Sequence, residues 1–154
     1  MADVTEGAPA PDFELAGADG PIRLSDFKGK ALVLYFYPKD DTAGCTREAQ
    51  DFSAAIADFA AAGAAVLGVS KDSLARHAKF AAKYDLKVQL GSDPEGAVIE
   101  RYDSWVEKSL YGRKYMGIDR STFLIDSSGR IRRIWRKVKT AGHAQQVLDA
   151  VREL

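Results

Sequence analysis

The sequence predicts an α/β fold in which helices flank a central mixed β-sheet. Three apolar runs of strand length indicate strands buried on both faces, and they cover residues 31–37, 64–70 and 122–125. Segments with apolar residues at helical spacing follow the first two runs, and an antiparallel hairpin and a helix follow the third. Strands and helices in this order are what a thioredoxin-like α/β sandwich requires.

The first part of the chain predicts a strand followed by a long helix. Gly7–Pro11 forms an extended lead-in, because its prolines exclude a helix. Pro38 ends the strand over 31–37. From about Gly44 to Ala62 apolar residues recur at helical spacing, and Gly63 closes that helix.

The middle of the chain predicts a second strand–helix unit and then a shorter one. The strand over 64–70 precedes a helix that Asp72 or Ser73 caps and that runs to about Tyr84. A short strand near 88–90 leads through a turn at 92–96 into a short helix. The side chains expected along one side of these two helices are Leu74, His77, Phe80, Ala81, Val98, Ile99 and Tyr102.

The last part predicts a hairpin and a terminal helix. The strand over 122–125 is joined to a partner over 131–135 by a turn at 126–129. Residues 143–152 carry an apolar helical face. No repeat, low-complexity tract or linker divides the chain, so we expect one domain over residues 1–154.

Composition and charge exclude several classes of function. The chain has 154 residues, of which 46% are apolar and 29% charged, as in a folded globular protein. Its formal net charge is +0, which disfavours nucleic acid or an anionic membrane as the main partner. The first residues carry acids rather than a basic start and an apolar run, and no window approaches the length of a membrane span. We therefore expect a cytoplasmic protein.

The chain has one cysteine, Cys45. This excludes a disulfide within the chain, a zinc site of several cysteines and a Cys-x-x-Cys redox pair, and no cofactor or metal site is expected. A single cysteine is either a small buried side chain or a reactive thiol, and its neighbours decide between the two.

Cys45 is expected in the first turn of its helix, where unpaired backbone N–H groups favour a thiolate. Lowering the pKa of a thiol from about 8.5 to about 6 takes about 3.4 kcal/mol. A helix end supplies about 2 kcal/mol at best. Asp40 and Asp41 are close in sequence and oppose a thiolate, so a cation is needed. Lys39, Arg47 and Arg120 are the candidates. Arg120 is favoured because it heads the strand over 122–125, which would place it at the end of the sheet where the Cys45 loop should lie.

Several motifs carry a resemblance to a known family. Pro38, Thr42 and Cys45 spell Pro-x-x-x-Thr-x-x-Cys, which resembles the active-site motif of peroxiredoxins. The blocks 36–48 and 120–126 resemble the bacterioferritin comigratory protein or peroxiredoxin Q subfamily. The resemblance extends over nearly the whole chain through the blocks 68–73, 92–96 and 111–117.

The resemblance implies a thiol peroxidase that reduces hydrogen peroxide and organic hydroperoxides in antioxidant defence. Cys45 would attack one peroxide oxygen and become a sulfenic acid. Thr42 and Arg120 would hold the thiolate and polarise the O–O bond, with the backbone N–H of Cys45 as a further donor. Pro38 would shield the site from water, and Glu48 would orient the arginine.

The sequence departs from the subfamily at two positions. Many peroxiredoxin Q proteins have a resolving cysteine five residues after the first, where this chain has Gln50. We therefore expect a one-cysteine enzyme that an external thiol reduces, such as thioredoxin, glutaredoxin or a glutathione-like small thiol. Ala43 stands where the family often has proline. The resemblance favours a monomer, with a dimer as the alternative.

Two other functions remain open at this point. A redox sensor or binding module would need one oxidation of Cys45 rather than many turnovers. A thioredoxin-like disulfide reductase is a third alternative, although the chain lacks a Cys-x-x-Cys pair. Other side chains are interpreted as structural: the helix residues His77 and His143, the packing residues Trp105 and Trp135, of which Trp105 is also a candidate for the rim of the site, and a solvated basic loop with Lys108, Arg113 and Lys114.

Overall fold

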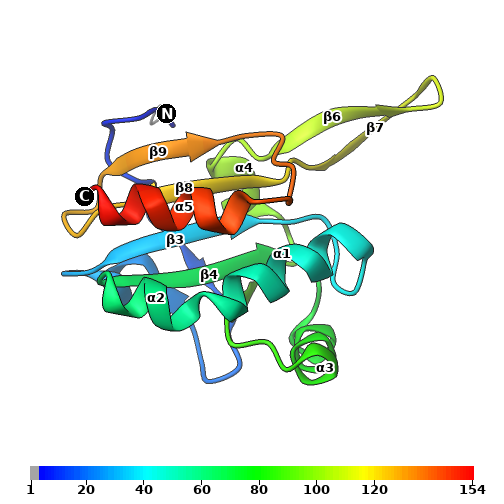
Figure 1. Ribbon diagram of the computed structural model, residues 1–154. Helices are drawn as coiled ribbons and strands as arrows, with labels where there is room; N and C mark the ends of the chain where they lie inside the picture. The colour runs from blue at the N-terminus through cyan, green and yellow to red at the C-terminus, as the bar shows by residue number, and fades with distance from the viewer. Residues whose placement is uncertain (1–3) are drawn as a thin grey trace.

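A five-stranded mixed sheet forms the centre of the molecule in the computed structural model, which describes residues 4–154 (Figure 1). The strand order is β5-β4-β3-β8-β9. Strands β3, β4 and β5 are parallel, whereas β8 pairs antiparallel with both β3 and β9. The bounds of these strands are β3 Ala31–Phe36, β4 Ala64–Ser70, β5 Gln89–Ser92, β8 Ser121–Ile125 and β9 Ile131–Trp135.

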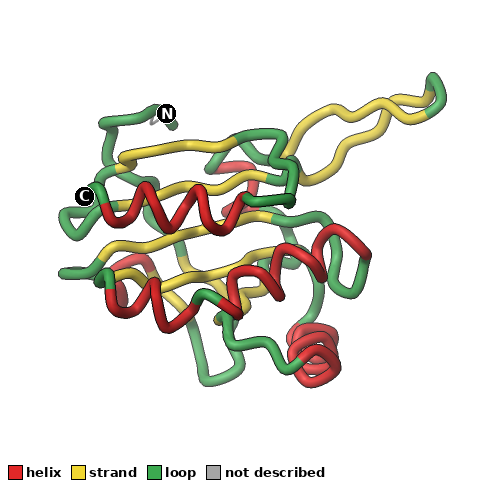
Figure 2. Tube along the Cα trace, in the orientation of Figure 1, coloured by secondary structure: helices red, strands yellow, loops and turns green. Residues whose placement is uncertain are grey.

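Helices cover both faces of this sheet (Figures 1 and 2). On one face lie α1 (Ala43–Ala54), α2 (Ile56–Ala61) and α5 (His143–Arg152), whose buried side chains share one core with Phe80 of α3 (Leu74–Tyr84). The other face carries α4 (Ala97–Arg101), the 3-10 helix η1 (Leu24–Phe27) and the N-terminal segment.

Strand β3 contributes alternate side chains to the two cores. Val33 and Tyr35 pack beneath α1 and α2, whereas Leu34 and Phe36 face the opposite core. Because a strand with helices on both sides has no polar face, its sequence is a continuous apolar run. The sheet order, its mixed direction and the flanking helices confirm the predicted thioredoxin-like fold.

Some predicted elements differ in their bounds. The single helix expected over 44–62 is two helices, because the backbone at Ala55 leaves helical geometry with φ −98° and ψ 6°. The strand expected near 88–90 is shifted to Gln89–Ser92. Of the two proposed caps of α3, Ser73 is the one that caps the helix, since its hydroxyl accepts from the N–H of Arg76 at 3.2 Å. A two-stranded sheet of β1 (Glu14–Leu15) and β2 (Ile22–Arg23) was not predicted.

The basic segment that was expected to be a solvated loop is a β-hairpin. Its strands are β6 (Trp105–Leu110) and β7 (Arg113–Ile118), and it projects from the body of the molecule (Figure 1). Tyr111 and Gly112 form the turn, with φ values of 51° and 77°. The prediction of a loop was wrong because most hairpin side chains are exposed on both faces, which leaves no alternation of apolar and polar residues.

Within the described residues, no helix is both long enough and apolar enough to cross a membrane.

Candidate active site

Cys45 lies in the first turn of α1, just after the loop that leaves the end of β3. Its side chain packs into the core beneath the helices, and the residue is 1% exposed. The first backbone N–H to find an acceptor in the turn is that of Thr46, which donates to the carbonyl of Thr42 at 2.8 Å. The N–H groups that precede it, including that of Cys45, point out of the helix start and favour negative charge there.

Arg120 reaches the sulfur from the start of β8, the strand that neighbours β3 in the sheet. Because β8 pairs antiparallel with β3 and Ser121 lies across from Phe36, Arg120 lies beside the loop that carries Cys45. Its Nη2 donates to Cys45 Sγ at 3.3 Å. Gly44 permits this approach, since a Cβ at that position would lie 3.1 Å from Nη2. The arginine therefore holds a fixed positive charge against the sulfur.

Glu48 fixes the other arm of this guanidinium. Arg120 Nη1 donates to Glu48 Oε1 at 2.8 Å, and the two side chains are 17% and 1% exposed. Glu48 lies three residues after Cys45, so both face the same side of α1. Burial raises the pKa of Glu48 to about 7, although Arg120 opposes this rise. The two terminal nitrogens of one guanidinium thus donate to the Glu48 carboxylate and to the Cys45 sulfur. These two hydrogen bonds set the orientation of the arginine.

The other predicted site residues lie on the exposed loop. Thr42 and Pro38 are both exposed. The Thr42 hydroxyl donates to the carbonyl of Lys39 at 2.8 Å, and no hydrogen bond joins it to the sulfur in the described part of the chain. Its donor is therefore used, and its oxygen keeps the capacity to accept. The two other candidate cations, Lys39 and Arg47, are exposed.

Each of the two acids that were expected to oppose a thiolate is paired with a basic side chain of α3. Asp40 is buried and lies 2.7 Å from His77 Nδ1. Asp41 accepts from Lys83 at 2.8 Å and from the Tyr84 hydroxyl at 2.5 Å, and these bonds lower the pKa of Asp41. Sequence reasoning missed this pairing, because the partners are 37 to 43 residues apart and no local motif marks them.

The histidine and the tryptophans that were interpreted as structural have packing partners of their own. His143 is buried, bonds Thr122 at 2.8 Å and packs edge-on against Trp135, and burial lowers the pKa of His143 to about 4. Trp105 lies beneath the ammonium of Lys71, 4.6 Å from the ring centre. Residues 4–154 contain no group of three or more His, Cys, Asp and Glu side chains placed to hold a metal ion.

Similar proteins match almost the whole chain. A sequence model of the AhpC/TSA family matches residues 7–134. Peroxiredoxin Bcp of Bacillus subtilis (strain 168) is 48% identical over 149 residues, which are 96% of this chain and 95% of that protein.

Solved structures of peroxiredoxins also match almost the whole chain. Peroxiredoxin Q of Xanthomonas campestris superposes with a TM-score of 0.87 at 44% identity, over 92% of this chain and 90% of that one. The bacterioferritin comigratory protein of Xanthomonas campestris, studied for its alkyl peroxide reduction activity, matches with the same values. PrxQ of Xylella fastidiosa reaches a TM-score of 0.92 at 36% identity, over 99% of this chain and 98% of that one. The chain therefore belongs to the AhpC/TSA family and, within it, to the Bcp or PrxQ peroxiredoxins, which are thiol peroxidases.

Proposed function

We propose that this peroxiredoxin reduces hydrogen peroxide and organic hydroperoxides at Cys45 and is regenerated by an external thiol. The observation that carries the proposal is the contact of Arg120 Nη2 with Cys45 Sγ at 3.3 Å, with the same guanidinium anchored to Glu48. The alkyl peroxide reduction of the Xanthomonas campestris relative supports organic hydroperoxides as substrates. Such an activity serves antioxidant defence.

The first step is attack of the Cys45 thiolate on the terminal oxygen of the hydroperoxide. An S–O bond forms as the O–O bond breaks. Hydroxide leaves from hydrogen peroxide and alkoxide from an organic hydroperoxide, and each takes a proton to become water or alcohol. Cys45 becomes a sulfenic acid, so sulfur is oxidised by two electrons and the peroxide is reduced. Negative charge moves from the sulfur onto the leaving oxygen of the peroxide during this step. Arg120 is a fixed donor beside this charge, and such a donor stabilises the transition state.

Thr42 and Pro38 are proposed to shape the entrance above the sulfur. The Thr42 hydroxyl donates its hydrogen bond to the Lys39 carbonyl. Its oxygen is therefore suited to accept a hydrogen bond from the O–H of the peroxide. The resemblance to peroxiredoxins implies that Thr42 helps to hold the thiolate and polarise the O–O bond, whereas this geometry favours Thr42 as an acceptor of the peroxide O–H. Pro38 is exposed on the same loop, so its shielding of the sulfur depends on how substrate fills the entrance.

Regeneration requires a thiol from outside the chain. The position where the resemblance implies a resolving cysteine is Gln50, which is exposed on α1, and the chain has one cysteine. An external thiol attacks the sulfenic sulfur to form a mixed disulfide and release water, and a second thiol releases the Cys45 thiol as a disulfide forms between the two donors. Thioredoxin, glutaredoxin and a glutathione-like small thiol all provide this chemistry.

Intact mass after one equivalent of peroxide tests the proposal. We expect a gain of one oxygen on Cys45, reversed when thioredoxin, glutaredoxin or glutathione is added singly, and repeatable over several cycles. A single oxidation that no donor reverses would favour the redox sensor instead. Oxidation no faster than that of a free thiol would contradict both functions. One domain over 1–154, a monomeric state and a cytoplasmic location stay predictions from the sequence.

A further inference from the structure

His77 of α3 is a buried histidine with a partner at each ring nitrogen. Nε2 lies 2.9 Å from the carbonyl oxygen of Gly91, and Nδ1 lies 2.7 Å from Asp40 Oδ2. The other carboxylate oxygen of Asp40 accepts from the Tyr37 hydroxyl at 2.5 Å. The side chains of His77 and Asp40 are 5% and 4% exposed, so solvent screens this pair little.

The bonding pattern places a proton on each ring nitrogen. A carbonyl only accepts, so Nε2 must donate to Gly91. With its proton on Nε2, a neutral ring could only accept at Nδ1, and an ionised Asp40 carboxylate also only accepts. The contact between Nδ1 and Asp40 Oδ2 therefore needs a proton between the two atoms. Burial opposes a charged ring, yet the hydrogen bond and the charge of Asp40 raise the pKa of His77. The two contacts and the raised pKa together favour an imidazolium that donates to Asp40.

We propose that His77 is a positioning residue for the oxidation of Cys45, because it holds Asp40 and with it the loop that presents Thr42 above the sulfur. The inference rests on the proposed peroxidase function. Asp40 precedes Thr42 by two residues and Cys45 by five, with no regular structure between β3 and α1 to fix the loop. A displacement of about 1 Å at such a site costs up to about a hundredfold in rate.

The anchors of the loop differ in strength. The backbone N–H of Asp40 donates to Asp72 Oδ2 at 2.8 Å, which ties the main chain to the segment before α3. Asp41 accepts from Lys83 and from the Tyr84 hydroxyl, but both bonds are exposed. The side chains of Asp41 and Lys83 are 42% and 57% exposed, and exposed ion pairs contribute little. The buried bond from His77 is thus the main side-chain anchor of the loop to α3.

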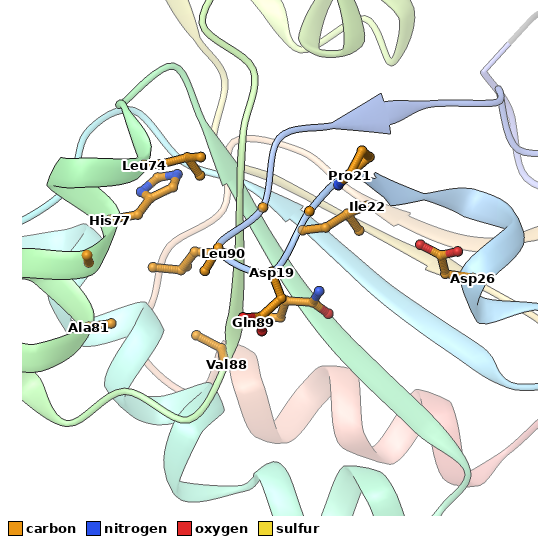
Figure 3. Close-up of a pocket in the computed structure, with 14 residues that line it drawn as sticks. Asp19, Pro21, Ile22, Asp26, Leu74, His77, Ala81, Val88, Gln89 and Leu90 are labelled. Atoms are coloured by element: carbon orange, nitrogen blue, oxygen red, sulfur yellow. The ribbon is translucent and has the colours of Figure 1, made fainter.

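Other charged groups around His77 come from three elements. A pocket of about 340 Å³ borders the ring between α3, β5 and the turn from β1 to β2, with His77 and Leu74 on its α3 side (Figure 3). The other ionisable residues of that pocket are the acids Asp19 and Asp26. Asp72 also raises the pKa of His77, whereas the basic side chains Arg76, Lys79 and Lys83 of α3 line a pocket with Asp40 and Asp41.

Two amide substitutions separate the two bonds of the ring. In His77→Asn the amide nitrogen replaces Nδ1 and can donate to Asp40 but not to Gly91. In His77→Gln it replaces Nε2 and can donate to Gly91 but not to Asp40. We expect the second-order rate constant for oxidation by hydrogen peroxide to stay within about threefold in the asparagine variant and to fall at least about tenfold in the glutamine variant.

The pH profile gives a readout that a purely structural role would not move. In the wild type the rate constant should fall at alkaline pH as His77 loses its Nδ1 proton, and this fall should be absent in His77→Asn. Urea denaturation of both variants provides the control, since each loses one hydrogen bond and the charge. If either variant does not fold, Asp40→Asn, which removes the carboxylate, should lower the rate constant and abolish the same alkaline fall.

The outcomes are distinguishable. Equal rate constants in the two amide variants, a glutamine variant as fast as the wild type, or an Asp40→Asn variant with the wild-type profile would overturn the positioning role. In each of these cases fast oxidation of the wild type would leave the peroxidase function intact. A wild type that oxidises no faster than free cysteine would instead remove the function on which the inference rests.

Discussion

Substitution of Gly44 by alanine should lower peroxidase activity while leaving or improving stability. Gly44 lies in the first turn of α1, and an added Cβ would be 3.1 Å from Arg120 Nη2. An ordinary carbon–nitrogen contact is about 3.5–4.0 Å, so the guanidinium must move by roughly 0.5 Å. It is held by Glu48 at 2.8 Å and by Cys45 at 3.3 Å, so movement lengthens one or both bonds.

The size of the effect follows from the strength of those bonds. A hydrogen bond to a charged group contributes about 1.5–3 kcal/mol, and partial loss of about 1.4 kcal/mol corresponds to a tenfold slower reaction. Alanine is a better helix former than glycine by at most about 1 kcal/mol, which favours folding of the variant. We therefore expect a rate constant about tenfold lower together with an unchanged or higher urea midpoint.

Stopped-flow oxidation by hydrogen peroxide measures the rate constant, and Gln50→Ala is the matched control. Gln50 is an exposed residue of the same helix, so its substitution changes helix propensity without touching the arginine. A double-mutant cycle with Arg120→Met isolates the contact, since Gly44→Ala should have no further effect once the guanidinium is absent. An unchanged rate constant, or a loss that persists in the Arg120→Met background, would refute the reasoning.

Three further substitutions test the rest of the site. Arg120→Lys should slow oxidation by about a hundredfold, because an ammonium cannot bond Cys45 and Glu48 with one planar fork; a wild-type rate in stopped flow would mean that the fork is not needed. Cys45→Ser should show no gain of oxygen by intact mass, since the chain has one cysteine; any peroxide turnover would contradict the assignment. Burial raises the pKa of Glu48 to about 7, above its ordinary value of 4.5, so the wild type should lose stability as pH rises from about 4.5 through 7. Glu48→Gln should not show this loss, and parallel urea curves for the two proteins across that range would argue against it.

The long apolar strands and the position of Arg120 could be predicted from the sequence, because few other structures are compatible with these sequence patterns. A run such as 31–37 is continuous only in a strand covered on both faces, and β3 has that environment. Once the strand after Arg120 pairs with β3, the chain direction leaves the arginine at the end of the sheet where the Cys45 loop begins. The site geometry thus follows from topology, and topology follows from the order of the elements.

Features without a local pattern could not be predicted. The projecting hairpin of β6 and β7 exposes Leu110, Tyr111, Tyr115 and Met116, so its strands show no buried face, and the Tyr111–Gly112 turn is its one local signal. The sequence pattern also gives no sign of the break between α1 and α2 at Ala55. Apolar residues on both sides of the break, such as Phe52 and Phe59, still pack on the same core. The Asp40–His77 pair depends on how α3 packs over the loop, which no spacing in the sequence encodes.

The proposed function requires that the folded site, rather than the thiol alone, accelerates attack on peroxide. The most direct measurement compares the second-order rate constant of Cys45 oxidation by hydrogen peroxide in the native protein and in the same protein unfolded in urea, at equal pH. If the helix start and Arg120 act together as described, the native rate constant should be higher by at least about a thousandfold. Equal rate constants in the two states would contradict the account, since Cys45 would then react as an ordinary thiol.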